Sequence, residues 1–131
     1  MASIFSKIIS GEIPCHKIAE TDNCLAFLDI NPLRYGHTLV IPKLEVDYIF
    51  DVEDDLLTEM MLFSKKVSKG IMEVFKPNRI GVTIIGLEVA HAHIHLIPIN
   101  SLHDMDFTKP KMKHDPEKFE AIAKEISSYL D

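Results

Sequence analysis

The sequence predicts an α+β fold: a five-stranded antiparallel sheet, one long helix, and shorter helices at both ends of the chain. Short β-branched runs separated by turn residues indicate the strands, and one long stretch with apolar residues at helical spacing indicates the main helix. Strands that follow one another through short turns pair as hairpins, so we expect an antiparallel sheet. The 131 residues are expected to form a single domain, with residues 1–100 as its core and residues 101–131 as a C-terminal extension that carries a helix.

The first third of the chain is expected to hold a short helix and three strands. Ser3 can cap the helix at its beginning, and Gly11 can end it. The triplet Thr-Asp-Asn at residues 21–23 is typical of a turn and predicts a hairpin around it. The strands are expected over residues 16–20, 24–29 and 37–41.

The middle of the chain carries the long helix. Apolar residues recur every three or four positions from Asp54 to Phe75, which is the pattern of an amphipathic helix. Gly70 costs such a helix up to about 1 kcal/mol, so we expect a neighbouring element to pack closely there. Further strands are expected over residues 80–85 and 89–98, followed by an irregular tail over residues 101–114 and a last helix that begins at Pro116.

Composition and charge exclude several classes of protein. The formal net charge is −6 and the 14 Lys and Arg residues are scattered, which argues against binding to nucleic acid or an anionic membrane. No apolar run approaches the roughly 18 residues of a membrane-spanning helix, and we expect an unexported, cytoplasmic protein. Cys15 and Cys24 are too few for a disulfide framework and are expected to be reduced thiols. The expected partner is a small molecule.

Three of the seven histidines alternate with apolar residues in one short run: His91, His93 and His95. Alternate side chains of a strand share a face, so we expect the imidazoles on one face and Ala92, Ile94 and Leu96 on the other. Three protonated imidazoles would repel one another, so burying them requires an anion or shared hydrogen bonds. A strand needed only for stability would carry Val or Thr at these positions.

Two kinds of chemistry use such a row of histidines. Two histidines separated by one residue on a strand can bind Zn²⁺. The outer members of the row would lie about 13 Å apart at roughly 3.3 Å per residue, so one ion would leave a histidine unused. In phosphoryl chemistry a neutral imidazole attacks phosphorus while neighbouring rings bind the phosphate oxygens, which gives every histidine a role. The row therefore favours phosphoryl transfer over a metal site.

The segment from His91 to Ile97 resembles the His-x-His-x-His-x-x signature of the histidine triad (HIT) superfamily, with an apolar residue at each x. Three further segments resemble the family in the same order, over residues 4–14, 25–30 and 36–43. Together they are similar to the Hint branch, the nucleoside phosphoramidate hydrolases. The resemblance implies a HIT-like fold, a homodimer, and a hydrolase that requires no metal or other cofactor.

The resemblance also implies roles for four histidines. His93 would be the nucleophile that attacks the α-phosphorus of a nucleoside 5′-phosphoramidate or related nucleotidyl ester. A covalent nucleotidyl-histidine intermediate would form, and water would hydrolyse it to release a nucleoside monophosphate. His95 and His37 would bind phosphate oxygens, and His91 would orient the nucleophile.

The nucleoside would be held by residues from the first half of the chain and by two residues shortly before the triad. Asp29 matches the carboxylate that binds the ribose hydroxyls in the family. Glu88 and Val89, shortly before the triad, are also expected at the nucleotide, where the Glu88 carboxylate would repel a phosphate unless it pairs with a protonated histidine or a leaving-group amine. The residues that match the base pocket of the family are apolar, namely Ile4, Phe5, Ile8, Phe27, Ile30 and Leu39.

The chain departs from the family in two places. Many Hint-branch proteins carry Cys-x-x-Cys and a further histidine that bind a structural zinc, whereas this chain has Ser3, Ser6 and Glu45. We therefore expect no structural zinc. The family also has a Gly-rich segment with Asn, Gln and Ser before the triad, and the segment over residues 82–89 lacks these three residue types.

Three alternatives stay open at this point. The first is a Fhit-like hydrolase of dinucleoside polyphosphates, which the quoted segments fit less well. The second is a nucleotide-binding module with negligible turnover, which the altered segment over residues 82–89 favours. The third is a metal-binding protein that uses His91 and His93.

Overall fold

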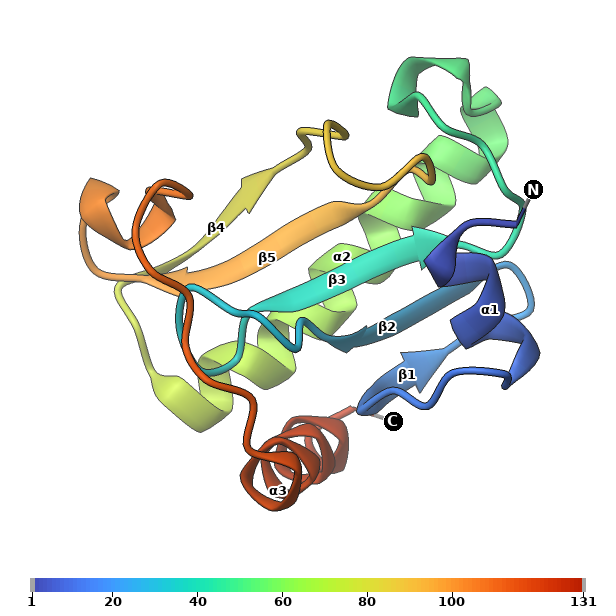
Figure 1. Cartoon of the computed structure of the whole chain (residues 1–131). Coiled ribbons are helices and arrows are strands. Elements are labelled where there is room, and N and C mark those ends of the chain that lie inside the picture. Colours follow the sequence, from blue (N-terminus) through green and yellow to red (C-terminus); the bar gives the residue numbers. More distant parts are fainter. Residues whose placement is uncertain (1, 131) are drawn as a thin grey trace.

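The computed structural model describes residues 2–130 and contains the predicted five-stranded antiparallel sheet (Figure 1). The spatial order of the strands is β1-β2-β3-β5-β4, and every neighbouring pair is antiparallel. The fold is therefore α+β, as the sequence predicted. The strands are β1 (Lys17–Glu20), β2 (Cys24–Leu28), β3 (Thr38–Pro42), β4 (Arg79–Thr83) and β5 (Ile94–Ile99).

The helices cover both faces of the sheet. The long helix α2 (Asp54–Phe75) and the C-terminal helix α3 (Pro116–Ser128) pack on one face, and the short helix α1 (Ile4–Ser10) lies on the other (Figure 1). Two short 3₁₀ helices, η1 (Ile49–Asp51) and η2 (Leu102–Met105), lie in the connecting segments. Within residues 2–130, no helix has the length and apolar character needed to cross a bilayer.

The period-two alternation of the strands divides the core into two parts. Ala26 of β2, Val40 of β3 and Ile94 of β5 belong to the larger cluster, which packs against α2 and α3. The residues next to Ala26 and Val40 in the sequence face α1 and form the smaller cluster with Phe5 of that helix; its buried members are Phe5, Leu25, Phe27, Leu39 and Ile41. The candidate site lies on this second side of the sheet.

Both predicted helix ends and the predicted close approach at Gly70 are present. The Ser3 hydroxyl accepts a hydrogen bond from the Ser6 N–H at the beginning of α1, and Gly11 adopts a left-handed conformation at its end. A Cβ atom at Gly70 would lie 2.8 Å from the Ile126 carbonyl oxygen in α3. Glycine therefore allows the two helices to pack with their backbones in close contact.

The predicted strand over residues 89–98 is partly wrong. The β5 strand begins only at Ile94, and residues 84–93 form an irregular connection from β4. The Ala92 N–H donates to the carbonyl oxygen of Val46, outside the sheet, which is why the ladder ends before this residue. The alternation of side chains nevertheless continues, because Ala92 is buried in the larger cluster together with Ile94 and Leu96.

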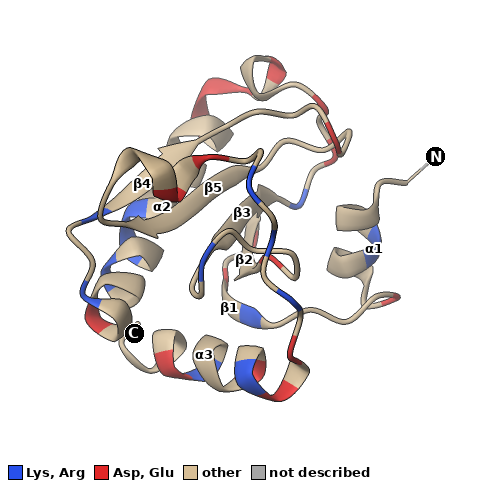
Figure 2. Cartoon of the chain, turned by 60° about the vertical axis from the view of Figure 1, so that its left-hand side comes forward, with Lys and Arg blue, Asp and Glu red and all other residues tan. Residues whose placement is uncertain are grey.

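The C-terminal extension crosses the ends of the central strands before it enters α3 (Figure 2). The Met112 N–H donates to the Pro32 carbonyl oxygen at 2.8 Å. Nε2 of His114 lies 2.9 Å from Nε2 of His16, whose Nδ1 lies 2.9 Å from a carboxylate oxygen of Glu120. These contacts fasten the extension to the first half of the chain on both sides of the crossing.

Candidate active site

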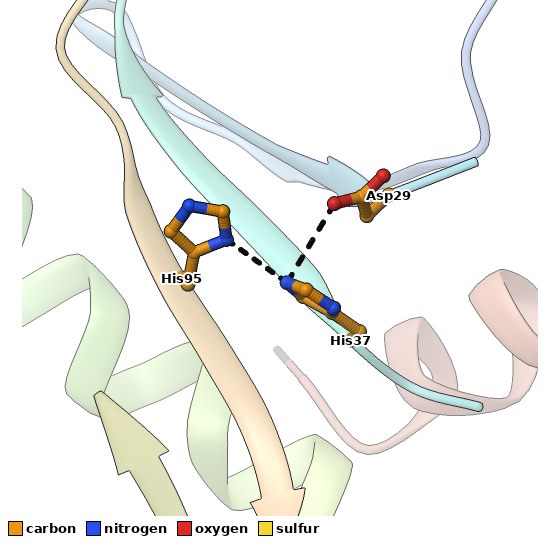
Figure 3. Close-up of side chains that lie close together, drawn as sticks. All are labelled: Asp29, His37 and His95. Atoms are coloured by element: carbon orange, nitrogen blue, oxygen red, sulfur yellow. Dashed lines mark hydrogen bonds and ion pairs between the residues drawn. The ribbon is translucent and has the colours of Figure 1, made fainter. Parts of the chain in front are cut away.

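The histidines meet where β3 lies between β2 and β5. In the register of the sheet, His95 pairs with Leu39 and Leu28 pairs with Thr38. His37 precedes β3 and Asp29 follows β2, so the two residues reach His95 from adjacent strands (Figure 3). The structure thus brings together the predicted phosphate-binding pair His37 and His95 with the predicted ribose-binding Asp29.

The hydrogen bonds of His37 define its tautomer and that of His95. The Leu33 N–H donates to Nδ1 of His37 at 3.0 Å, so this nitrogen is unprotonated. Nε2 of His37 then carries the proton and donates it to Nδ1 of His95, which lies 2.9 Å away (Figure 3). In the neutral ring the remaining nitrogen of His95, Nε2, carries a hydrogen. The pair therefore offers an N–H donor suited to a phosphate oxygen.

Burial keeps this pair uncharged. It lowers the pKa of His37 from 6.5 to about 3, and the nearby charges of Lys111 and His93 act in the same direction. Burial also lowers the pKa of His95 to about 3, with smaller effects from His37 and His93. Oδ2 of Asp29 lies 3.6 Å from Nε2 of His37. This distance is too long for a hydrogen bond, so the carboxylate does not offset the effect of burial on the pKa of His37.

His93 has the geometry of a nucleophile. Its Nδ1 lies 2.7 Å from the His91 carbonyl oxygen, which can only accept, so Nδ1 is protonated. In the neutral ring the lone pair is then on Nε2. Among residues 2–130, every buried side-chain nitrogen and oxygen has a hydrogen-bond partner. The Nε2 atoms of His93 and His95 bond to no protein group, so both atoms are open to solvent. The rings of His93 and His95 are adjacent, with centroids 4.9 Å apart.

His91 is buried and lies one layer further from solvent. Its Nε2 donates to the Pro42 carbonyl oxygen at 2.8 Å, which leaves Nδ1 as an acceptor for the Ser3 hydroxyl at 2.8 Å. Burial lowers the pKa of His91, and the bond to Pro42 partly opposes this shift. Because its own carbonyl accepts from His93, His91 contacts the nucleophile through its backbone and not through its ring.

Glu45 completes a polar network around Ser3. One carboxylate oxygen of Glu45 accepts from the Ser3 N–H at 2.7 Å and from the Ser6 hydroxyl at 2.6 Å. These two hydrogen bonds lower the pKa of Glu45 to about 2. Zinc in structural sites is held by thiolate, imidazole and carboxylate groups, and serine hydroxyls do not fit that donor set. The residues at the family's zinc positions hydrogen-bond to one another instead.

The apolar residues predicted for the base pocket separate into two groups. Phe5, Phe27 and Leu39 are buried in the smaller cluster, and Ile8 and Val89 pack against it. The side chains of two others, Ile4 and Ile30, are 49% and 46% exposed. The Phe5 ring also contacts the His93 ring edge to face, with centroids 5.0 Å apart, so the apolar cluster borders the histidines.

Glu88 is not a hydrogen-bond partner of the four site histidines. It is exposed on the connection over residues 84–93. The hydrogen bonds of the four site histidines go to other groups, which are named above.

Phe107 is a site residue that the sequence did not indicate. It comes from the C-terminal extension, and its ring packs edge to face against His95 and His37 with centroid distances of 5.0 and 6.0 Å. The extension has no periodic pattern at this point, so its sequence carries no signal for this contact. Phe107 covers the histidine pair on the side of the extension and contributes to its burial.

Among residues 2–130, Asp29, His37 and His95 form one cluster that could offer three ligand atoms to a metal, all within 4.8 Å of one another. The relevant nitrogens of His37 and His95 already share a proton. An ion at this point would have to displace that proton and break the bond between the rings.

The fold and the paired histidines together define a histidine-triad protein. A HIT domain profile matches residues 10–102, and the chain belongs to this family.

The curated relatives support the Hint-like branch that the sequence suggested. The chain is 38% identical over 132 residues to adenosine 5′-monophosphoramidase hnt1 of Schizosaccharomyces pombe, covering 99% of both proteins. It is 35% identical over 100 residues to adenylylsulfatase HINT3 of Arabidopsis thaliana, which is 72% of this chain and 51% of that protein. The crystal structure of a Hit-like protein from Bartonella henselae matches with a TM-score of 0.85 at 32% identity, covering 98% of this chain and 96% of the other. These relationships support a nucleotide hydrolase.

Proposed function

We propose that this protein hydrolyses nucleoside 5′-phosphoramidates or related nucleotidyl esters at the α-phosphorus, with His93 as the nucleophile. The observation that carries the proposal is the pairing of the His93 Nδ1–H with the His91 carbonyl oxygen. This bond directs the lone pair of Nε2 toward solvent, next to the N–H donor of His95. A sequence motif alone could not distinguish this tautomer from the inactive one.

The reaction would proceed in two displacements at phosphorus. In the first, Nε2 of His93 forms a bond to the α-phosphorus, and the bond to the leaving group breaks with its electron pair on the leaving group, which takes a proton from solvent when it is an amine. The imidazolium that results keeps its Nδ1–H on the His91 carbonyl oxygen, which stabilises the positive charge. In the second, a water oxygen attacks phosphorus, the N–P bond breaks with its electron pair on Nε2 of His93, and the nucleoside monophosphate is released while the water gives a proton to solvent. The Nε2–H of His95, held in place by His37, would bind a phosphate oxygen in both steps.

The nucleoside would lie on the apolar cluster beside the histidines. Phe5, Phe27 and Leu39 present this surface, with Ile8 and Val89 at its edge. The exposed Ile4 and Ile30 would be covered by the base and would gain burial on binding. Asp29, which is only partly buried, would accept hydrogen bonds from the ribose hydroxyls.

We further propose that the whole chain acts as one domain and that two copies form a homodimer. Met61 and Leu62 on α2 and Val82 on the edge strand β4 are large apolar residues exposed to solvent. A second copy would bury these side chains and pair the free edge of β4. Sedimentation equilibrium would measure this association directly, and a monomer at micromolar concentration would refute it.

The catalytic proposal is tested with adenosine 5′-phosphoramidate. Purified protein should release AMP and ammonia, His93→Ala should lose this activity by at least about a thousandfold, and His103→Ala should retain it. His103 is an exposed histidine in η2 and serves as the matched control. Intact-mass measurement during turnover by a His95→Ala variant should reveal the nucleotidyl adduct. Equal rates for the wild type and His93→Ala would instead favour the nucleotide-binding module without turnover. That alternative is based on the absence of Asn and Gln from residues 82–89.

A further inference from the structure

The C-terminal extension brings positive charge to the histidine pair. Three lysines, at positions 109, 111 and 113, alternate along the segment that crosses the ends of β2 and β3 (Figure 2). Phe107 packs on His95 and His37 at one end of this segment, and the Met112 N–H is bound to the Pro32 carbonyl oxygen at the other. The backbone between them is therefore held next to the site.

Lys111 is the lysine of this segment whose ammonium lies near the ring of Phe107. Its ammonium donates to the carbonyl oxygens of Phe107 and Lys109, and its Nζ lies 5.8 Å from the centroid of the Phe107 ring. The same ring packs against His95, with centroids 5.0 Å apart. The charge of Lys111 is also the largest electrostatic influence on His37, after burial. Phe107 thus contacts both the ammonium and the phosphate-binding pair.

The histidine pair itself supplies no positive charge. His37 and His95 are neutral at pH 7, and Asp29 adds a carboxylate beside them. A substrate with one negatively charged phosphate can be held by neutral N–H donors. A substrate with a second anionic group next to the α-phosphate carries more charge, and the connection over residues 84–93 has no Asn or Gln side chain to bind it.

We propose that Lys111 binds an anionic leaving group, such as sulfate or phosphate, attached to the α-phosphorus of the nucleotide. This inference rests on the proposed function and specifies its substrate class. The ammonium has three donors, so it can turn toward the ligand while it keeps one of its carbonyl partners. Lys111 is then a specificity-determining residue, since it would contact the leaving group and not the attacking ring.

The chemistry of the leaving group agrees with this assignment. When His93 attacks a nucleotidyl sulfate, the N–P bond forms, the P–O bond to sulfate breaks, and its electron pair stays on the sulfate oxygen. Sulfate leaves as a stable dianion without a proton, and a fixed cation stabilises the charge that develops on it. Ammonia leaving a phosphoramidate must instead gain a proton, and a nearby ammonium gives it no charge to stabilise.

The experiment compares kcat/KM for adenylyl sulfate and for adenosine 5′-phosphoramidate in four proteins: the wild type, Lys111→Met, Lys111→Arg and Lys113→Met. The kcat/KM for adenylyl sulfate divided by that for adenosine 5′-phosphoramidate should fall about tenfold or more in Lys111→Met, which is the effect of losing one charge-assisted hydrogen bond. The ratio should be restored in Lys111→Arg. Lys113→Met removes the same charge from the same segment and should keep the wild-type ratio. A ratio that does not change in Lys111→Met, or that falls equally in Lys113→Met, would overturn the proposal.

A binding measurement separates this proposal from the proposed catalysis. If the wild type turns over neither substrate, catalysis by His93 fails, but the role of Lys111 can still be measured with ADP and AMP by calorimetry. The wild type should bind ADP more tightly than AMP, and Lys111→Met should reduce that preference about tenfold. Equal preference in the two proteins would refute the anion site independently of any activity.

Discussion

The hydroxyl of Ser3 lies 2.8 Å from Nδ1 of His91 and joins the N-cap of α1 to the first histidine of the triad. The same oxygen accepts from the Ser6 N–H, so one side chain both caps the helix and donates to the histidine ring, whose tautomer is fixed by the Pro42 carbonyl oxygen. The His91 carbonyl oxygen in turn holds the nucleophile His93. The beginning of the chain is therefore coupled to the proposed reaction centre through two hydrogen bonds.

Replacement of Ser3 should affect both stability and turnover. Ser3→Ala removes the cap, which costs about 0.5–2 kcal/mol, and leaves Nδ1 of His91 without its donor. We expect a lower free energy of unfolding in urea, together with a fall in kcat for adenosine 5′-phosphoramidate. Ser3→Thr keeps the hydroxyl and should retain most of both. If Ser3→Ala loses stability but no activity, the hydroxyl serves only as a cap.

The stability of the protein should depend on pH through the His37–His95 pair. Both pKa values lie near 3 in the folded protein and near 6.5 in the unfolded chain, so between these values the unfolded chain binds more protons. Stability from this pair is complete above pH 6.5 and falls as the pH is lowered toward 3. Each histidine contributes a slope of up to about 1.4 kcal/mol per pH unit in that window.

The variant His95→Gln isolates this effect from that of the carboxylates. It removes one of the two titrating groups and keeps an acceptor for Nε2 of His37. Urea unfolding at pH 7 and pH 5 should reveal a smaller loss of stability on acidification in His95→Gln than in the wild type. Parallel losses in the two proteins would place the acid sensitivity elsewhere.

Phe107 should control the acidity of the histidine pair. Phe107→Ala removes the ring that packs on His95 and His37, and water then reaches both imidazoles. Because burial is the main cause of their low pKa values, we expect both values to rise toward 6.5. NMR titration of the imidazole ring protons measures this shift. Leu102→Ala changes an exposed apolar residue of the same extension and should leave the titration as it is in the wild type.

Gly70 should be required for the packing of α3 on α2. An added Cβ would lie 2.8 Å from the Ile126 carbonyl oxygen and 3.0 Å from a methyl carbon of Leu130. Alanine favours the helix by up to about 1 kcal/mol, but displacement of α3 should cost about 1–3 kcal/mol, so Gly70→Ala should destabilise the protein. Thermal unfolding tests this sign. Lys69→Ala changes an exposed position of the same helix and should have little effect.

Local sequence patterns predicted the elements of this fold well because each element has its own periodicity. The spacing of apolar residues from Asp54 to Phe75 gave α2 its observed ends, and Gly70 indicated close packing before any partner was known. The alternation through His91, His93 and His95 predicted a shared face, although the β5 ladder begins only at Ile94. The hydrogen bond from the Ala92 N–H to the Val46 carbonyl oxygen, which lies outside the sheet, is not encoded in a strand pattern.

The tautomers of the site histidines could not be predicted in the same way. They depend on Leu33 and Pro42, whose contacts to the histidines join segments that no local pattern relates. The cover provided by Phe107 has the same origin, because the extension returns to the site only after the sheet is complete. Chemistry at a site of this kind is decided by contacts between remote segments.

The hydroxyl and carboxylate network around Ser3 also determines which environments the site can withstand. Its members are two alcohols, one carboxylate and one imidazole, none of which forms disulfides under oxidising conditions. Serine hydroxyls do not belong to the donor set of structural zinc, so hydrogen bonds hold the network together. Redox stress and metal starvation should thus leave the anchorage of α1 intact.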